Sequence, residues 1–353
     1  MTTPNQETSQ KPDITTDKEN WLLHFPIMFF AAIMGLGGLA LVVSKTLKTF
    51  ELETNLLWFS NVLSILSVIL FCGITLLYLA KILLYYPAFL KELKHPVRIN
   101  FFAAISVSLL IILMLLLRLT WIPLWFAFAL FYIGAFLQLI FSLYVVRFWF
   151  INEMQQKMAN PAWFIPIVGN LIVPLAGANL NLQNESGWIP FEILIFYFGM
   201  GSFFWILLNA TLLIRLVFGE NLPQKFLPTL FIFIAPPSIF ALDILVLFEK
   251  FTDISTLYGI ASASFSVALF FMFLMISLLK VFRQLKFALS WWAFTFPTTA
   301  FTLCALELYA LGGSLFYAFF GILGIVLSSI LVCIVALRTL LAIKQRQICV
   351  LEE

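Results

Sequence analysis

The side chains that could do chemistry in this 353-residue chain are few, and most of them interrupt long apolar runs. Asp243 and Glu307 are the acidic residues placed deepest within such runs, whereas His24 and Arg98 lie close to the ends of others. Carboxylates inside an apolar segment often take part in proton relays, and cationic groups at the mouth of a passage attract anions. This pattern indicates proton or ion movement rather than bond-breaking chemistry.

Each of these residues also has a structural interpretation. Asp243 and Glu307 could be hydrogen-bonded groups near an interface, and we favour this because neither has a basic partner nearby in the sequence. If either carboxylate titrates during transport, the protein would instead be a proton-coupled carrier. His24 and Arg98 could line the cytoplasmic mouth of a passage, but a solvated interfacial histidine and a charge that only sets topology are the commoner case.

Sequence signatures of catalysis and of metal or cofactor binding are absent. The chain has two histidines and four cysteines, with no His-Glu-x-x-His or Cys-x-x-Cys motif. Residues 199–203 match a serine-nucleophile signature poorly because no base accompanies them. We therefore expect no enzyme activity, no metal and no cofactor, and the net charge of +3 is too small to indicate a nucleic-acid partner.

Composition places the chain in a membrane. Apolar residues make up 63% of the sequence and charged residues only 10%, and the mean hydropathy is +1.05. About 20 apolar residues are needed to cross a hydrocarbon layer roughly 30 Å thick. The sequence therefore predicts ten spans, near residues 22–44, 55–84, 99–118, 121–150, 162–182, 187–217, 227–248, 255–282, 288–311 and 313–342.

Proline divides these spans into two classes, because interior prolines occur in four of the five odd-numbered spans. An interior proline removes a helix hydrogen bond at a cost of roughly 3 kcal/mol, and in lipid the freed carbonyl needs another partner. Broken odd spans should therefore lie inside the bundle or along a wet cavity, with unbroken even spans facing lipid. The odd-span prolines are Pro26, Pro166, Pro174, Pro236, Pro237 and Pro297.

The starts of the odd spans recur roughly every 65 residues, which is the length of a helical hairpin. We predict an all-α membrane protein of five helical hairpins in a ring, with odd helices lining a central pore and even helices outside. Sixteen of the 20 Lys and Arg residues fall on the side of both termini, which predicts cytoplasmic termini. The expected parts are a disordered tail (1–20), a transmembrane domain (21–345) and a short cytoplasmic tail (346–353).

Phe296, which directly precedes Pro297 in the ninth span, is the candidate pore gate. With 41 phenylalanines in the chain, any single one is more often ordinary packing than a gate. A phenyl ring can nevertheless plug a narrow pore without adding charge, and its positive edge tolerates an anion. The position before a proline on an inner helix strengthens the gate interpretation somewhat, while ordinary packing stays the commoner case for the residue by itself.

Four segments resemble the tellurite-resistance/C4-dicarboxylate transporter family, which includes the bacterial tellurite-resistance protein A and the plant slow anion channel. The resemblance covers essentially residues 21–345. Its most specific part is Trp291-Trp-Ala-Phe-Thr-Phe-Pro297, and the other segments are residues 95–102, 161–170 and 227–237.

The resemblance implies a homotrimer surrounded by lipid, in which each protomer has its own five-helix pore, closed at mid-membrane by a phenylalanine corresponding to Phe296. It implies a channel of the bacterial inner membrane that passes small inorganic anions such as chloride and nitrate. Secondary transport of C4-dicarboxylates, or efflux of tellurite or another oxyanion, is the alternative, because family members carry those names. Residues 100–104 lack a proline expected from the family, so the third span is expected to lack a kink.

Overall fold

The computed structural model describes residues 20–120, 122–182 and 188–349, and every regular element within these ranges is helical. Ten helical spans are long and apolar enough to cross a membrane, which confirms the predicted number for the described part of the chain. Most of the two predicted tails, residues 1–19 and 350–353, lies outside the described residues.

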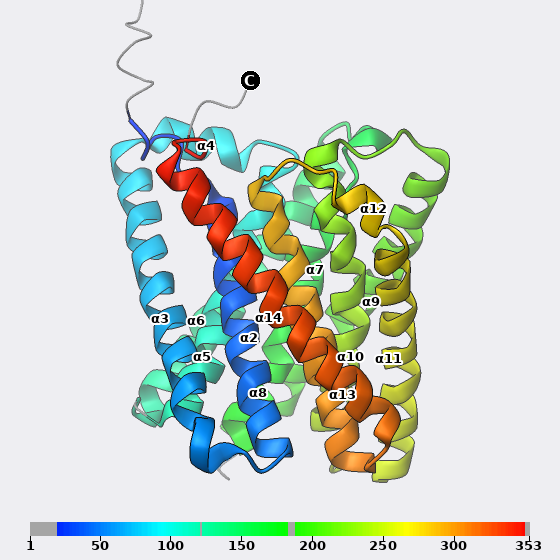
Figure 1. Ribbon diagram of the computed structural model, residues 1–353. Helices are drawn as coiled ribbons and strands as arrows, with labels where there is room; N and C mark the ends of the chain where they lie inside the picture. Colours follow the sequence, from blue (N-terminus) through cyan, green and yellow to red (C-terminus); the bar gives the residue numbers. More distant parts are fainter. Residues whose placement is uncertain (1–19, 121, 183–187, 350–353) are drawn as a thin grey trace, which may run out of the picture.

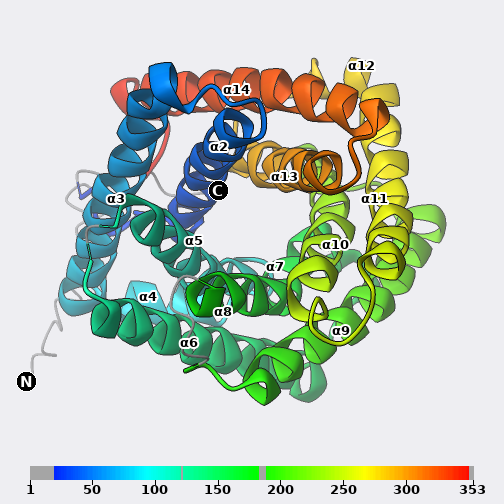
Figure 2. The same cartoon turned by 90° about the horizontal axis from the view of Figure 1, so that it is seen from below.

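Five long helices form the outside of the bundle, and Figure 2 shows them as a four-sided frame around the others. Only 22–44% of the residues in the apolar window of each outer helix are buried, because most of each helix surface faces outward. Such an apolar exterior matches the hydrocarbon of a bilayer. The outer helices are α3 (Glu53–Leu84), α6 (Leu124–Ile151), α9 (Phe191–Phe218), α11 (Ile254–Ser277) and α14 (Leu315–Lys344).

The odd-numbered spans form a closed inner ring, in which 67–89% of the residues in each apolar window are buried. Their α-helical parts are α2 (Phe30–Thr49), α5 (Ala103–Leu119), α8 (Ile172–Leu182), α10 (Ala235–Leu247) and α13 (Thr295–Gly312). α2 contacts α5, α5 contacts α8, and the contacts continue through α10 and α13 back to α2 (Figure 2). The predicted division into inner odd helices and outer even helices is therefore confirmed.

Each inner span starts with a 3₁₀-helical stretch before it becomes α-helical. These stretches are η1 (Ile27–Phe29), η2 (Arg98–Phe102), η4 (Pro161–Trp163), η6 (Gln224–Ile234) and η7 (Leu289–Phe294). In the fifth span, α7 (Phe164–Val168) and η5 (Gly169–Leu171) lie between η4 and α8. The third span, which is expected to lack a kink, shows the same change of helix type, from η2 to α5 at Ala103, without a proline.

The odd-span prolines lie where a helical segment begins. Pro26 precedes η1, while Pro166, Pro174 and Pro297 are each the third residue of their α-helical segment. Pro236 and Pro237 lie in the first turn of α10. Since a backbone N–H in the first turn has no acceptor within its own helix, proline costs little there. The prolines thus mark where a new segment starts rather than interrupt a continuous α-helix.

Side chains of neighbouring helices satisfy the carbonyls at these junctions. The Pro166 carbonyl accepts hydrogen bonds from Gln138 Nε2 at 2.8 Å and Ser142 Oγ at 2.6 Å, both on α6. The Pro237 carbonyl accepts one from Ser264 Oγ of α11 at 2.7 Å. These bonds supply the partners that a broken helix requires in lipid.

Both ends of the described chain lie on one face of the bundle, at the top of Figure 1. This face, called the terminal face below, also carries the short helices α4 (Tyr86–Leu93), α12 (Leu279–Phe282) and η3 (Gln156–Met158). The 3₁₀ stretches of the inner spans begin there. The opposite face carries the ends of the inner α-helices.

Candidate pore and vestibule

The five inner spans enclose a cavity of about 60 Å³, called the axial cavity below. Its lining is almost entirely apolar, and Ser290 supplies a hydroxyl at one end. This volume holds a few water molecules but is not a continuous aqueous passage. One lining residue from each inner span is Ala31, Phe101, Ile172, Ile239 and Phe296.

Phe296 is the second residue of α13 and is partly exposed to the axial cavity. Its neighbours Phe294 and Phe301 are held by other rings, with centroid distances of 4.8 Å to Phe231 and Phe265 respectively. In the described part of the chain, no such ring contact involves Phe296. The Phe296 ring therefore lines the cavity without a stacking partner that would fix its orientation.

The predicted prolines divide between the two cavities. Pro236 and Pro297 border the axial cavity, and Pro26 borders a second cavity on the terminal face. Pro166, Pro174 and Pro237 are buried in the inner ring and line neither cavity.

The second cavity, called the vestibule below, has a volume of about 650 Å³. It shares Leu289 and Ser290 with the axial cavity, so the two adjoin. Four cationic side chains and one carboxylate line it: Lys81, Lys91, Arg98, Lys225 and Glu92. This excess of positive charge raises the local concentration of anions.

The structure brings the two predicted mouth residues, His24 and Arg98, together in the vestibule wall. His95 also lines it, and its Nδ1 accepts hydrogen bonds from the backbone N–H groups of Val97 and Arg98 at 3.1 and 3.2 Å. These bonds hold the turn in which Arg98 starts the third span. The two histidines thus border the same space as the cations.

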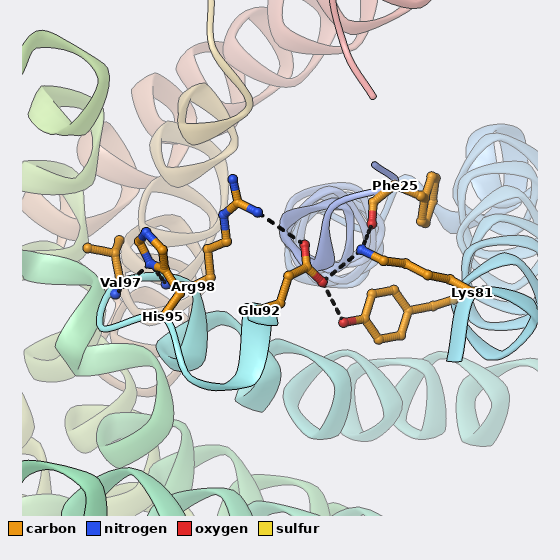
Figure 3. A network of polar contacts seen from close by, with 7 residues as sticks. Phe25, Lys81, Glu92, His95, Val97 and Arg98 are labelled. Carbon is orange, nitrogen blue, oxygen red and sulfur yellow. Dashed lines mark hydrogen bonds and ion pairs between the residues drawn. The ribbon is translucent and has the colours of Figure 1, made fainter. Parts of the chain in front are cut away.

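Glu92 of α4 is the centre of a polar network shown in Figure 3. Its Oε2 lies 3.0 Å from Lys81 Nζ and accepts a hydrogen bond from the Tyr78 hydroxyl at 2.8 Å. Its Oε1 lies 3.7 Å from Arg98 Nη1. Lys81 Nζ also donates to the Phe25 carbonyl at 2.7 Å, and the Lys81 and Glu92 side chains are only 2% and 4% exposed. The network joins α3, α4 and the start of the first span.

Sequence reasoning treated Lys81 and Arg98 mainly as topological charges and missed Glu92. The available signal is that Tyr78 and Lys81 are three residues apart and therefore share one face of the second span. That signal is weak, since it does not identify the carboxylate that the face contacts. The contact depends on the fold of α4 back over the terminal face (Figure 1).

Towards the opposite face, Glu307 of α13 forms an ion pair with Lys45 of α2. Glu307 has no basic partner nearby in the sequence, and the fold supplies one from a distant part of the chain. Asp243 differs from Glu307: it is fully buried, and neither of its carboxylate oxygens has a hydrogen-bond partner among the described residues. The favoured interpretation of Asp243 as a hydrogen-bonded structural group is not supported.

The pore-facing side of the inner helices can be followed past Phe296. Five partly exposed residues lie within otherwise buried stretches: Leu41, Met114, Asn179, Val246 and Leu303. Each follows a residue of the axial cavity by seven positions, which is two helical turns. Between the cavity and these positions the inner helices are buried, except for Phe240, whose ring contacts α9. The passage is thus closed beyond Phe296.

A ring of five helical hairpins around an axial cavity, with an adjoining cationic vestibule, defines a helical membrane protein of the pore type. Residues 24–340 match the SLAC1 family, described as voltage-dependent anion channels, and the chain belongs to this family.

Similar proteins carry the names of S-type anion channels, uncharacterized transporters and a tellurite resistance protein homolog. The S-type anion channel SLAH2 of Arabidopsis thaliana is 30% identical over 309 residues, which cover 84% of this chain and 56% of that protein. The uncharacterized transporter MJ0762 of Methanocaldococcus jannaschii is 30% identical over 324 residues, covering 86% and 88% of the two chains. The tellurite resistance protein TehA homolog of Haemophilus influenzae is 28% identical over 212 residues, covering 60% of each. The chain spans about half the length of the plant relatives SLAH2 and SLAH3.

Proposed function

We propose that this protein is an anion channel that passes small monovalent anions such as chloride and nitrate down their gradients. The observation that carries the proposal is the adjoining pair of cavities, in which a cationic vestibule leads to an apolar axial cavity with Phe296 in its wall. The vestibule attracts anions, and the cavity offers no fixed charge that would bind them tightly. Weak binding is what conduction requires. Membership of the anion channel family supports the same function.

Phe296 is the proposed gate. Its ring occupies the wall where the passage narrows, and rotation of the ring towards the vestibule would lengthen the open path. Pro297 directly after it and Pro236 on the facing helix keep backbone N–H donors out of this section of the wall. The remaining prolines act by defining where the inner α-helices begin.

The test is electrophysiology of wild type and Phe296→Ala under chloride, nitrate and malate gradients. We expect Phe296→Ala to raise the anion current many-fold, with a reversal potential that follows chloride or nitrate. Phe319→Ala is the matched control, since Phe319 is 61% exposed on outer helix α14 and should leave the current unchanged. An unchanged current in Phe296→Ala, with normal assembly, would contradict the gate.

A coupled carrier for C4-dicarboxylates or an oxyanion such as tellurite is the second candidate. The buried Asp243 carboxylate favours it, because intramembrane carboxylates often couple transport to protons. A carrier gives saturable, proton-linked malate flux and small currents even after Phe296 is truncated. Large currents that do not saturate favour the channel.

We further propose that the terminal face is cytoplasmic, in a bacterial inner membrane, and that the protein is a homotrimer. The excess of Lys and Arg on the terminal face supports this orientation. The exposed leucine, isoleucine and phenylalanine side chains of the outer helices suit lipid and a neighbouring protomer equally. Light scattering of the detergent-solubilised protein tests the trimer, and protease accessibility in oriented vesicles tests the side on which the termini lie.

A further inference from the structure

Asp243 lies on the side of α10 that faces the pore axis. Two neighbours mark the outward side of this helix: the Pro237 carbonyl accepts a hydrogen bond from α11, and the Phe240 ring contacts aromatic rings of α9. Ile239 lines the axial cavity, and Asp243 follows it by four residues. Residues four apart in an α-helix share a face, one turn apart. The Asp243 carboxyl group therefore lies in the closed section of the passage, between the axial cavity and the opposite face.

The polar side chains near the ends of the inner helices at the opposite face include one from each helix: Lys45, Arg118, Asn179, Asp243 and Glu307. Four of them have partners. Lys45 pairs with Glu307, Arg118 donates a hydrogen bond to Asn61 Oδ1 of α3 at 3.1 Å, and Asn179 donates to the Leu175 carbonyl at 2.7 Å. Neither carboxylate oxygen of Asp243 has a hydrogen-bond partner among the described residues. An unpartnered, buried polar group of this kind requires an explanation.

The titratable groups on the elements around α10 do not supply a counter-charge. α8 has none, and α13 contributes Cys304 and Tyr309 together with Glu307, whose charge is already compensated by Lys45. The remaining groups are Glu192, Tyr197 and Arg215 on α9, Asp253 and Tyr258 at the start of α11, and Lys225 on η6. No ion pair or hydrogen bond joins any of these to Asp243 in the described structure.

We propose that Asp243 is a proton-binding site in the pore wall, and that its protonation admits the anion. The proposal rests on the proposed channel function and adds a regulating ligand to that pore. The neutral carboxylic acid offers an O–H donor to an anion that has left its hydration shell. The ionised carboxylate repels the same anion, and it is costly to bury without a partner. Acidification of the opposite face should therefore favour anion passage.

The experiment measures chloride and nitrate currents of the full chain in planar bilayers while the pH on each side is varied separately. Phe296→Ala provides the open background, to which Asp243→Asn or Glu192→Gln is added. Asparagine keeps the shape and remains neutral at every pH, whereas exposed Glu192 on α9 is a matched carboxylate at the same end, outside the pore.

We expect the Phe296→Ala current to fall by about tenfold as the pH on the opposite face rises, because the ionised carboxylate repels the anion. With Asp243→Asn added, the current should stay high at all pH values, and with Glu192→Gln added the pH dependence should persist. An unchanged pH profile in the Asp243→Asn variant overturns the proton site while leaving the channel intact. Absence of anion current in Phe296→Ala itself would instead contradict the channel function.

An optical measurement covers the case in which Asp243→Asn assembles poorly. Infrared difference spectra of the wild-type protein should show a protonated carboxyl band that depends on pH. A shift of this band in Asp243→Glu, which keeps a carboxyl group, assigns the band to this residue. An unshifted band in Asp243→Glu overturns the assignment.

Discussion

The two halves of the passage are built in different ways. On the terminal face the inner spans begin as 3₁₀ helices, and they border a vestibule of about 650 Å³. Towards the opposite face the same spans are regular α-helices whose facing residues are buried. The 3₁₀ form is narrower and rises about 2.0 Å per residue against 1.5 Å for the α form. Irregular backbone thus accompanies open space, and regular backbone accompanies closure.

Electrostatics and packing also differ between the halves. The terminal half is joined by the buried network around Glu92 (Figure 3), whereas the opposite half depends on close contact between α2 and α13. A Cβ atom on Gly35 would lie 2.1 Å from Thr295 Oγ1, and one on Gly38 would lie 2.4 Å from Thr299 Oγ1. Glycine at these positions allows the two helices to approach. The comparison shows that ionic contacts border the open half, whereas small residues let the inner helices pack closely in the other half.

The largest stability change should come from Glu92→Gln, which removes the counter-charge of Lys81. Breaking a buried ion pair from one side leaves an uncompensated charge and costs roughly 3 kcal/mol. We therefore expect a clear loss of thermal stability in the detergent-solubilised protein, with loosening of α4 detected by hydrogen exchange. Lys91→Gln is the control, since Lys91 is exposed on the same helix and should change stability little. Equal stability of the two variants would show that the terminal half does not depend on this network.

A smaller effect is expected from Gly38→Ala in the opposite half. The new methyl group meets the Thr299 side chain, and overpacking of this kind costs about 1–3 kcal/mol. Gly199→Ala on α9 is the matched control: no atom lies within 4 Å of the added Cβ, so helix propensity should stabilise it by up to about 1 kcal/mol. Thermal unfolding of both variants measures the difference. If Gly38→Ala is as stable as Gly199→Ala, close packing does not close this half.

The smallest effect concerns Asp253, an exposed carboxylate only ten residues after Asp243. It caps α11 by accepting hydrogen bonds from Ser255, from the Thr256 N–H at 2.9 Å and from the Thr256 hydroxyl, which lower its pKa from 3.8 to about 2. Since the folded pKa is depressed, the stabilisation is complete above about pH 4 and is lost as the pH falls through about 2. Asp253→Ala should reduce stability slightly at neutral pH and weaken this acid dependence. Unfolding curves between pH 2 and 7 check both points, and an unaltered acid dependence would contradict the cap.

The span positions show how accurately hydropathy predicts the limits of the membrane helices. All ten predicted spans agree with the structure to within about five residues at each end, apart from details such as the separation of α12 from α11 at Leu278. The first span shows such a displacement at both ends, running over Ile27–Thr49 rather than 22–44, because the prediction places Lys45 and Lys48 in a loop. Lys45 instead remains on α2 and pairs with Glu307. A charge can stay in a helix when another helix supplies its partner, which sequence spacing does not reveal.

The sequence by itself determined the membrane class, the ten spans and the separation of inner from outer helices. These follow from local properties. The length of an apolar run matches the thickness of the bilayer, and an interior proline does not suit a continuous lipid-facing helix. Tertiary structure decided the rest: that the third span begins with a 3₁₀ stretch without proline, that Glu92 joins α3 to the first span, and that Glu307 is paired while Asp243 is not. Partners of buried charges come from residues distant in the chain, so only the folded ring brings them within a few ångströms.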